Sequence, residues 1–315
     1  MTPAPRCSVV IPVRDMARYL PEAVESVLAQ EGCDCDLVIV DDGSTDGSGE
    51  VARKYASRRV TVVADGKAEG LAAARNRGLL HVRAPAVVFL DADDRLIRGA
   101  LARLLGPLES DPLLAVAYGE VVPIDELGRR LSAARRPIFG RRRASGDVLA
   151  AVLRGSPIIT PGAACIRRRH LDEAGGFRGL PVGEDWEFWC RLALVGRFRY
   201  LHGPPVLEYR SHPTSLTATR GDRVEDLQLA LEAIYGNPAV RARFPAWFLR
   251  QERRRCLTGV YAYAGRIALK NRRWAVARRH LVECLRRDPT RLREAIFLLA
   301  ALARWIPGPL RRRIK

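Results

Sequence analysis

The stretch VVFLDADDRL, residues 87–96, places three aspartates after a run of four apolar residues. The apolar run predicts a short buried strand, because no polar residue interrupts it. Asp91, Asp93 and Asp94 follow at its end. Like charges this close repel one another, and they lose hydration energy when buried. The three carboxylates therefore lie either in a solvated turn or around a positive charge.

Asp-x-Asp-Asp spacing after a buried strand offers hard oxygen ligands to a divalent cation such as Mg²⁺ or Mn²⁺. Two carboxylates are then enough, because such an ion keeps waters and phosphate oxygens in its shell. The charge of the ion also removes the repulsion between the carboxylates. The alternative is that the aspartates cap a helix in the pattern at 95–105. Both interpretations stay open from this stretch alone.

Strand and helix patterns alternate around this stretch through the first hundred residues. Strand-like runs begin at residues 7, 36, 59 and 86, and apolar residues recur at helical spacing over 19–30, 49–56 and 70–82. This alternation predicts an α/β fold, a parallel sheet with helices on both faces. Ligands of such sheets bind beyond the carboxyl ends of the strands. The polar clusters at 12–15, 41–46 and 91–94 fall there.

The rest of the chain changes character at about residue 220. Residues 100–220 mix strand and helix patterns, whereas the chain after 222 is helical and rich in arginine. Residues 259–289 predict two helices joined by a short turn, either a single tetratricopeptide-like unit or a generic helical hairpin. We therefore predict two domains, 1–220 and 221–315.

The charge lies mostly in the second of these regions. The whole chain has a net charge of +18, and residues 221–315 hold 22 Lys and Arg against 8 Asp and Glu. Such a basic surface favours an anionic partner: membrane phospholipid, a lipid phosphate or nucleic acid.

Cysteine usage and the N-terminus predict a cytoplasmic protein. The seven cysteines are irregularly spaced, and Cys33 and Cys35 have no His or Cys cluster downstream, so reduced thiols are expected rather than a zinc site. The sequence MTPAPRCSVV lacks the pattern of a secretory signal. No run of eighteen apolar residues predicts a membrane-spanning helix.

Three further motifs hold candidate functional residues, each with a structural alternative. Asp42, after a strand, either accepts a hydrogen bond from the imide N–H of a uracil base or stabilises its own turn. Arg75, near a helix start, either binds phosphate or is an ordinary helix charge. In GEDWEFW, residues 183–189, Glu184 and Asp185 either suit the helix N-terminus or supply a general base. Trp186 and Trp189 are candidates to stack on a sugar face, and the alternative for Trp189, at helical spacing, is a place in the core.

Six short motifs occur together in the order and spacing of one family: SVVIPVRD, IVDDGSTDGS, AAARNRGL, FLDADD, GGF and GEDWEFWCRLA. Over about residues 5–220 the chain resembles the family 2 glycosyltransferases, which have the GT-A fold. The resemblance implies a Rossmann-like, mixed but mostly parallel sheet flanked by helices. It also implies an inverting transferase that uses a nucleotide-diphospho-sugar, usually UDP-linked, and Mg²⁺ or Mn²⁺.

The resemblance also implies roles for individual residues. At the donor nucleotide it places Pro12, Asp42, Arg75 and Asp91. At the metal it places Asp93 and Asp91, assisted by Asp94, and His212 at the metal or the diphosphate. For catalysis it implies Asp185 as general base, with Glu184 beside the acceptor or the leaving sugar.

The chain departs from the family pattern in its first motif, which has PVRD where PVYN is commoner. The QxxRW motif and the spanning helices of processive polysaccharide synthases do not occur, so addition of a single sugar is expected. The acceptor class expected is a glycan or a lipid-linked molecule. Three alternatives remain: a nucleotidyltransferase, a nucleic-acid-binding module and a degenerate binding protein. The sequence lacks the G-x-G-x-R…K signature of the first. It also lacks the interleaved aromatic residues expected of the second.

The C-terminal stretch AIFLLAALARWIPGPLRRRIK, residues 295–315, predicts contact with a membrane surface. Nine apolar residues of helix rise about 14 Å, far less than a bilayer core. Trp305 and the clustered arginines suit the headgroup level instead, on the inner face of the cell membrane. The alternative is that Ile296, Leu299 and Trp305 pack on the preceding helices.

Overall fold

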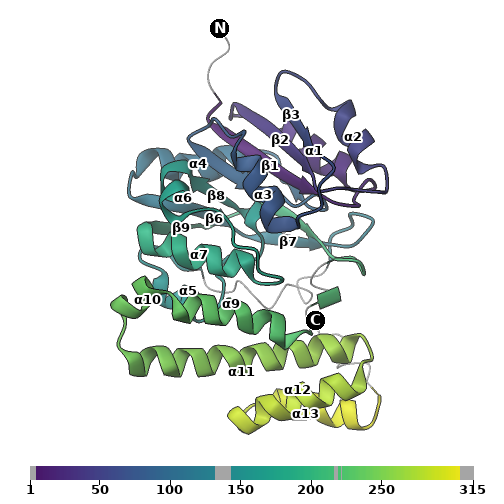
Figure 1. Cartoon of the computed structure of the whole chain (residues 1–315), viewed down its shortest axis with the longest axis vertical. Helices are drawn as coiled ribbons and strands as arrows, with labels where there is room; N and C mark the ends of the chain where they lie inside the picture. Colours follow the sequence, from purple (N-terminus) through teal and green to yellow (C-terminus); the bar gives the residue numbers. More distant parts are fainter. Residues whose placement is uncertain (1–4, 132–142, 216–218, 221, 306–315) are drawn as a thin grey trace.

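The computed structural model describes residues 5–131, 143–215, 219–220 and 222–305 (Figure 1). A seven-stranded sheet in the order β3-β2-β1-β4-β8-β6-β9 forms its centre. These strands are β1 (Cys7–Val13), β2 (Cys35–Asp41), β3 (Val60–Ala64), β4 (Ala86–Phe89), β6 (Leu114–Gly119), β8 (Ala164–Arg167) and β9 (Arg197–Leu201). A smaller sheet, β5-β10-β7, consists of β5 (Arg95–Leu96), β7 (Val121–Ile124) and β10 (Leu207–Arg210).

The large sheet is mixed and mostly parallel, as the resemblance implied. Strand β8 runs antiparallel to both of its neighbours, β4 and β6, and the remaining described pairings of this sheet are parallel. The first four strands and the helices between them lie where the sequence pattern predicted. The predicted fold class is therefore confirmed.

Helices cover both faces of this sheet, and the alternation of side chains along β1 builds a core on each face. Val9 and Ile11 pack in one cluster with α1 (Leu20–Leu28) and α4 (Ala100–Ser110). Val10, between them, packs in the other cluster, with α3 (Leu71–Leu79), α5 (Leu149–Leu153) and α7 (Glu184–Val195). Two short helices, α2 (Ser48–Lys54) and α6 (Arg168–Ala174), complete this part of the chain.

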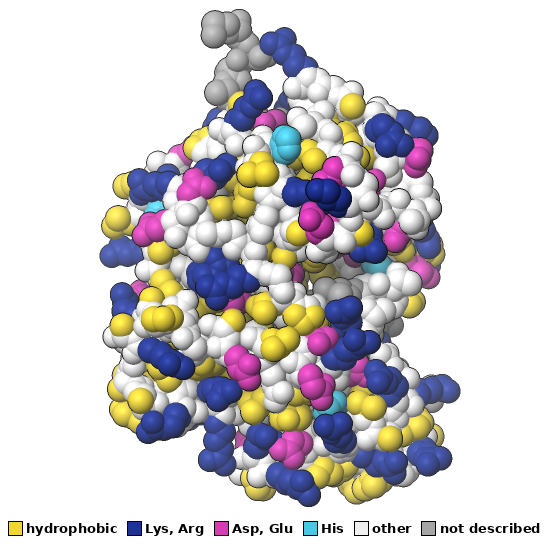
Figure 2. All heavy atoms as spheres, viewed as in Figure 1, with side chains coloured by type: hydrophobic (Ala, Val, Ile, Leu, Met, Phe, Trp, Pro, Cys, Tyr) yellow, Lys and Arg dark blue, Asp and Glu magenta, His cyan; other side chains and the backbone are white. Residues whose placement is uncertain are grey.

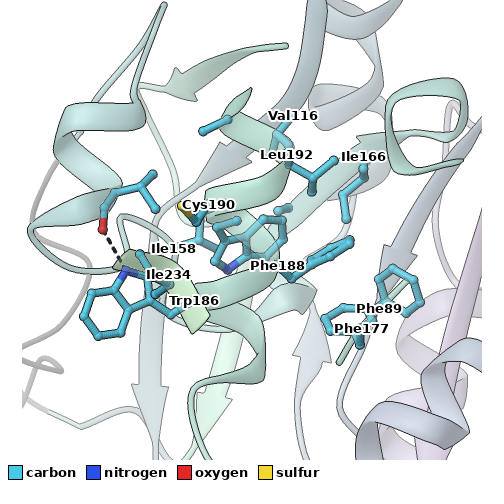
Figure 3. Close-up of a cluster of buried hydrophobic side chains, with 14 of the residues drawn as sticks. Phe89, Val116, Ile158, Ile166, Phe177, Trp186, Phe188, Cys190, Leu192 and Ile234 are labelled. Carbon is cyan, nitrogen blue, oxygen red and sulfur yellow. Dashed lines mark hydrogen bonds between the residues drawn. The ribbon is translucent and has the colours of Figure 1, made fainter. Parts of the chain in front are cut away.

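Helix α7 is fixed by its aromatic side chains, which Figure 3 shows against the sheet. Trp189 is completely buried, so it belongs to the core, and the suggestion that it stacks on a sugar is wrong. Trp186 is 9% exposed, and its indole N–H donates to the carbonyl of Val152 at 2.7 Å. These contacts hold the beginning of α7, with Glu184 and Asp185, in a fixed position.

Helix α3 approaches β1 closely enough to require glycine at residue 78. A Cβ atom built there would lie 2.3 Å from Val10 Cγ1. We expect Gly78→Ala to lower the free energy of unfolding by about 1–3 kcal/mol, the usual effect of overpacking. The control is Gly259→Ala in the helix α11 (Ala246–Lys270), where a Cβ meets no atom within 4 Å. It should raise stability by about 0.5–1 kcal/mol. Equal effects of both changes in chemical denaturation would contradict this packing.

The C-terminal part is helical, as predicted. It consists of α9 (Val224–Gly236), α10 (Pro238–Arg243), α11, α12 (Trp274–Arg287) and α13 (Leu292–Leu302). Figure 1 shows α9 beside α7, then α11, and α12 with α13 at the lower end of the molecule. Helices α11 and α12 form the predicted hairpin, with residues 271–273 between them. The division into domains at residue 220 stays a prediction.

Among the described residues, no helix has the length and hydropathy needed to cross a bilayer.

Candidate active site

Loops that follow β1, β2 and β4 meet at one edge of the sheet, because parallel strands end on the same side. The backbone N–H of Asp42 donates to the carbonyl of Val13 at 2.8 Å. Asp15 accepts a hydrogen bond from the backbone N–H of Thr45 at 2.7 Å. The predicted polar clusters after β1 and β2 are therefore held directly against each other.

A pocket of about 600 Å³ opens at this edge. Its lining includes the end of β1, the start of α3, the segment 177–181 and the first residue of α7. Of the predicted site residues, it contains Pro12, Asp42 and Glu184. The pocket is thus the candidate donor site, and it has room for a nucleotide. Several of the other predicted site residues do not line it.

Asp42 is 2% exposed and joins the end of β2 to the start of α3. Its carboxylate accepts hydrogen bonds from the backbone N–H groups of Glu69 and Gly70, each at 2.9 Å, and from Arg77 at 3.0 Å. A carboxylate has about four lone-pair positions, so one remains for another donor. The sequence did not reveal these local contacts.

Arg75 lies behind the pocket wall, 1% exposed, between two predicted site carboxylates. Its Nη2 is 2.8 Å from Asp91 Oδ1, and its Nη1 is 2.9 Å from Glu184 Oε1. The guanidinium also lies 4.9 Å from the ring centre of Phe177. These contacts make Arg75 the link between the turn after β4 and the start of α7. A contact between Arg75 and the nucleotide stays a prediction.

Asp91 uses both carboxylate oxygens in this structure. Oδ1 contacts Arg75, and Oδ2 accepts a hydrogen bond from the hydroxyl of Thr160 at 3.0 Å. Thr160 was not among the predicted site residues, because no motif of the sequence connects residue 160 with this turn. The positive charge that the sequence required among the aspartates is supplied here by Arg75.

Asp93, in the same turn, lies beside His212. Their Oδ2 and Nε2 atoms are 2.8 Å apart, and Nδ1 of His212 is 2.9 Å from the hydroxyl of Thr214. The structure thus brings together two residues that are 119 positions apart in the chain, and their role at a metal stays a prediction.

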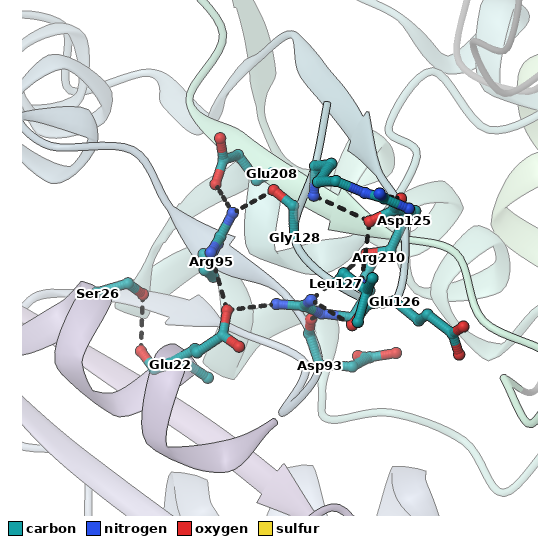
Figure 4. Close-up of polar contacts among 12 residues, drawn as sticks. Glu22, Ser26, Asp93, Arg95, Asp125, Glu126, Leu127, Gly128, Glu208 and Arg210 are labelled. Carbon is teal, nitrogen blue, oxygen red and sulfur yellow. Dashed lines mark hydrogen bonds and ion pairs between the residues drawn. The ribbon is translucent and has the colours of Figure 1, made fainter. Parts of the chain in front are cut away.

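Arg210 fixes the backbone of this turn. Its Nε donates to the carbonyl oxygen of Asp93 at 2.7 Å, and its Nη2 lies 2.7 Å from Glu22 Oε2. Figure 4 shows Arg210 and Arg95 converging on Glu22, while the carboxylate of Asp93 points away from Arg210. Arg210 is 1% exposed and was missed, although it stands two residues before His212 in the motif YRSHPTS.

Asp94 is buried and accepts a hydrogen bond from the backbone N–H of Arg210 at 2.8 Å. Burial, together with the charges of Asp93 and Asp91, raises the pKa of Asp94 well above its ordinary value. Helix α4 begins only at Ala100, with Gly99 at its N-cap. The alternative that the three aspartates cap this helix is therefore wrong.

Asp185 lies in the first turn of α7, after Gly183 in a left-handed conformation with φ of 79°. Burial raises the pKa of Asp185 from its ordinary value to about 7, and the neighbouring charge of Glu184 adds to the effect. The guanidinium of Arg75 acts in the opposite direction. A carboxylate with such a pKa is suited to accept a proton near neutral pH.

The donor atoms at the turn fit a divalent ion in part. Among the residues that the structure describes, no group of three or more His, Cys, Asp or Glu side chains is arranged around a possible ion. Asp93 and His212 nevertheless offer an oxygen and a nitrogen ligand side by side, whereas Asp91 is held by Arg75 and Thr160. Two protein ligands suffice for an ion that also binds phosphate oxygens and water.

Comparison with known proteins places this geometry in a family. The family model described as "Glycosyl transferase family 2" matches residues 8–175. An uncharacterized protein of Mycobacterium tuberculosis is 30% identical over 226 residues, which cover 69% of this chain and 70% of that protein. The uncharacterized glycosyltransferase EpsJ of Bacillus subtilis is 32% identical over 117 residues. That match covers 36% of this chain and 34% of EpsJ, so the chain spans about a third of this relative.

Solved glycosyltransferase structures share the fold. S. aureus TarS, in a structure with UDP-GlcNAc, superposes with a TM-score of 0.64 and 16% identity, covering 98% of this chain and 90% of that one. The mannosyltransferase PcManGT from Pyrobaculum calidifontis, in complex with GDP-Man and Mn²⁺, superposes with a TM-score of 0.61 and 20% identity. That match covers 99% of this chain and 85% of PcManGT.

Proposed function

The chain belongs to glycosyl transferase family 2, and from this premise we propose that it transfers a single sugar from a nucleotide-diphospho-sugar, with UDP as the expected nucleotide, to a glycan or lipid-linked acceptor. The observation that carries the proposal is the row of linked side chains Asp91–Arg75–Glu184 behind the pocket, with Asp185 next to it. Family membership favours this function over a nucleotidyltransferase or a nucleic-acid-binding module.

The mechanism proposed is a single displacement at the anomeric carbon. The carboxylate of Asp185 takes the proton of an acceptor hydroxyl, and the oxygen of that hydroxyl forms a bond to the anomeric carbon. The bond between this carbon and the diphosphate oxygen breaks from the opposite side. An α-linked donor therefore gives a β-linked product.

The leaving diphosphate needs positive charge as that bond breaks. We propose that Asp93 and His212 hold a divalent ion, Mg²⁺ or Mn²⁺. Asp93 Oδ2 and His212 Nε2 lie 2.8 Å apart. The ion supplies charge to the diphosphate oxygens when it is bound. Mn²⁺ accepts an imidazole ligand more readily than Mg²⁺ does, which favours Mn²⁺ if His212 binds. Arg75 keeps Glu184 and Asp91 in position, because it contacts both.

The first experiment is a screen of nucleotide sugars, with thermal stabilisation and donor hydrolysis as readouts. We expect UDP-sugars to stabilise the full chain and to be slowly hydrolysed in the presence of Mn²⁺ or Mg²⁺. Treatment with EDTA should remove both effects. Equally tight binding of a UDP-sugar by EDTA-treated protein would contradict the proposed role of the metal.

The exposed face of α13 supports a peripheral position on an anionic membrane. The large apolar side chains exposed on this helix and directly after it are Leu292, Ile296, Leu299, Leu302 and Trp305. The opposite face of α13 is buried, with Phe297 fully covered and Glu294 paired with Arg266 at 2.7 Å. Ile296, Leu299 and Trp305 are 48%, 65% and 61% exposed, and an exposed apolar patch of this kind marks an interaction surface. The alternative that Ile296, Leu299 and Trp305 pack on the preceding helices is therefore wrong.

We name this apolar face the α13 face and define it by Leu292, Ile296, Leu299 and Leu302. Arginines stand next to these residues in the chain at positions 291, 293 and 304. Figure 2 shows hydrophobic and basic side chains next to one another at the lower end of the molecule, where α12 and α13 lie. An apolar strip with a basic rim and a nearby Trp is typical of helices that lie in a membrane interface. The basic tail at 306–315, which the sequence predicted to act at the same surface, lies outside the described residues.

We expect the full chain to sediment with vesicles that contain phosphatidylglycerol. Ile296→Glu with Leu299→Glu should reduce this partition at least about tenfold, because each side chain contributes roughly 1.5–3 kcal/mol when buried. The control is Leu113→Glu, a similarly exposed leucine before β6. Equal partition of wild type and the double variant would contradict the proposal. So would a dimer in solution that the double variant dissociates, because a second copy would then cover the α13 face.

A further inference from the structure

A second pocket, of about 610 Å³, lies between the sheet-containing part of the chain and the C-terminal helices. We name it the arginine pocket. Its basic residues come from three places: Arg154 after α5, Arg255 and Arg266 on α11, and Arg291 before α13. Trp186, the third residue of α7, also lines this pocket. The proposed function uses none of these arginines.

Positive charge exceeds negative charge on the pocket lining. The four guanidinium groups face two lining carboxylates, Glu252 and Asp288. Glu252 is shared: its two oxygens lie 3.0 Å from Arg154 Nε and 2.8 Å from Arg255 Nη1. Glu252 is 1% exposed, so it is fully committed to these two partners. With Glu294, which pairs with Arg266 from outside the lining, three carboxylates stand against the four arginines, so one positive charge remains.

The arginines also keep unused hydrogen-bond donors. A guanidinium group has five N–H donors. The ion pairs described here use one nitrogen of each arginine: Arg266 contacts Glu294, and Arg291 contacts Asp288 at 3.1 Å. Arg266 is 6% exposed, and its Nε has no hydrogen-bond partner among the described residues. Forked donors of this kind match the oxygens of a phosphate group.

The start of α7 places the general-base position between the two pockets. Glu184 lines the donor pocket, and Trp186 lines the arginine pocket. Successive residues of an α-helix are about 100° apart around its axis, so residues 184 and 186 lie on nearly opposite sides, with Asp185 between them. A molecule bound by its phosphate in the arginine pocket would thus have to extend past Asp185 to bring a hydroxyl to the donor sugar.

We propose that the arginine pocket binds a phosphate group carried by the acceptor. The assignment of this phosphate to the acceptor rests on the proposed function, whereas the binding of phosphate in the pocket does not. An acceptor anchored there by its phosphate presents a neighbouring hydroxyl to Asp185. This role also explains why two arginines of the pocket belong to α11, a helix that contributes no residue to the donor pocket.

The test measures binding of inorganic pyrophosphate to the full chain by calorimetry in EDTA, which prevents binding through a metal. Arg255→Gln with Arg291→Gln removes two pocket charges but leaves Glu252 paired with Arg154. We expect at least a tenfold weaker affinity in this double variant. The matched control is Arg254→Gln with Arg286→Gln, which removes the same charge from the same part of the chain outside the pocket lining. It should bind within about twofold of wild type.

Asp93→Ala, which lacks the proposed metal ligand, should bind pyrophosphate in EDTA as wild type does, because no metal takes part. Loss of binding in Asp93→Ala, equal weakening in the pocket and control variants, or no binding by wild type would overturn the proposal. Pocket-dependent binding in a protein that hydrolyses no nucleotide sugar would instead contradict the proposed function alone. Vesicles of phosphatidylcholine with phosphatidic acid distinguish the two sources of the phosphate. Recruitment that depends on the arginine pocket indicates a phosphate carried by a lipid. If the protein binds pyrophosphate but is not recruited, the phosphate belongs to a soluble molecule. Either result supports the subsite.

Discussion

Asp185→Asn is expected to reduce the rate of sugar transfer by about 10²–10⁴, the usual contribution of a general base. The amide keeps the size of the side chain and its place in the first turn of α7, but it cannot take a proton. Donor affinity should stay within a few-fold of wild type, because Asp185 does not line the donor pocket. Transfer and UDP-sugar binding, measured on the same preparation, separate these two effects. Unchanged turnover would return Asp185 to the role of a charge at a helix start.

The raised pKa of Asp185 also predicts the pH dependence. The group acts as a base only when it is ionised, and burial raises its pKa to about 7. Below that pH the protonated fraction grows, so kcat/KM should fall about tenfold per pH unit, while above it the rate should level off. The acidic fall should be absent in the residual activity of Asp185→Asn. A fall in wild type that begins only near pH 4 would contradict the assigned pKa.

Asp93→Ala is expected to lower donor affinity and transfer rate together, because metal and diphosphate bind as a unit. We expect at least a hundredfold loss in kcat/KM and a weaker response of donor binding to Mn²⁺. Leu80→Ala serves as a control for general effects of substitution, because Leu80 is exposed at the C-terminal end of α3, outside the donor pocket. A variant at residue 93 with normal Mn²⁺-dependent donor binding would move the ion elsewhere.

The local sequence predicted the first four strands and their helices, since each has its own period and its own turn residues. It did not predict that β8 would lie antiparallel between β4 and β6, or that β5, β7 and β10 would form a second sheet. Those pairings join segments far apart in the chain, such as Glu208 and Arg95. The residues of these short strands show no pattern that identifies the strand with which each one pairs.

The same distinction applies to the candidate site. Aspartates at strand ends are visible in the sequence, because they stand beside apolar runs. Their ion-pair partners are not visible, because Glu184 is 109 residues from Arg75 and Glu22 is 188 residues from Arg210. The sequence singled out Arg75 as a nucleotide contact but not as the partner of Asp91 and Glu184, and among 49 arginines it did not reveal Arg210. Only the fold shows that Arg75 lies among the aspartates and glutamate of the turn and α7.

The stereochemistry of the released sugar distinguishes a single displacement at the anomeric carbon from a reaction with retention. In this experiment the full chain is incubated with an α-linked UDP-sugar and Mn²⁺, and ¹H NMR follows the anomeric proton of the product before mutarotation mixes the two forms. We expect the β-anomer to form first, because water replaces the acceptor in a single displacement assisted by Asp185. Initial release of the α-anomer would contradict it.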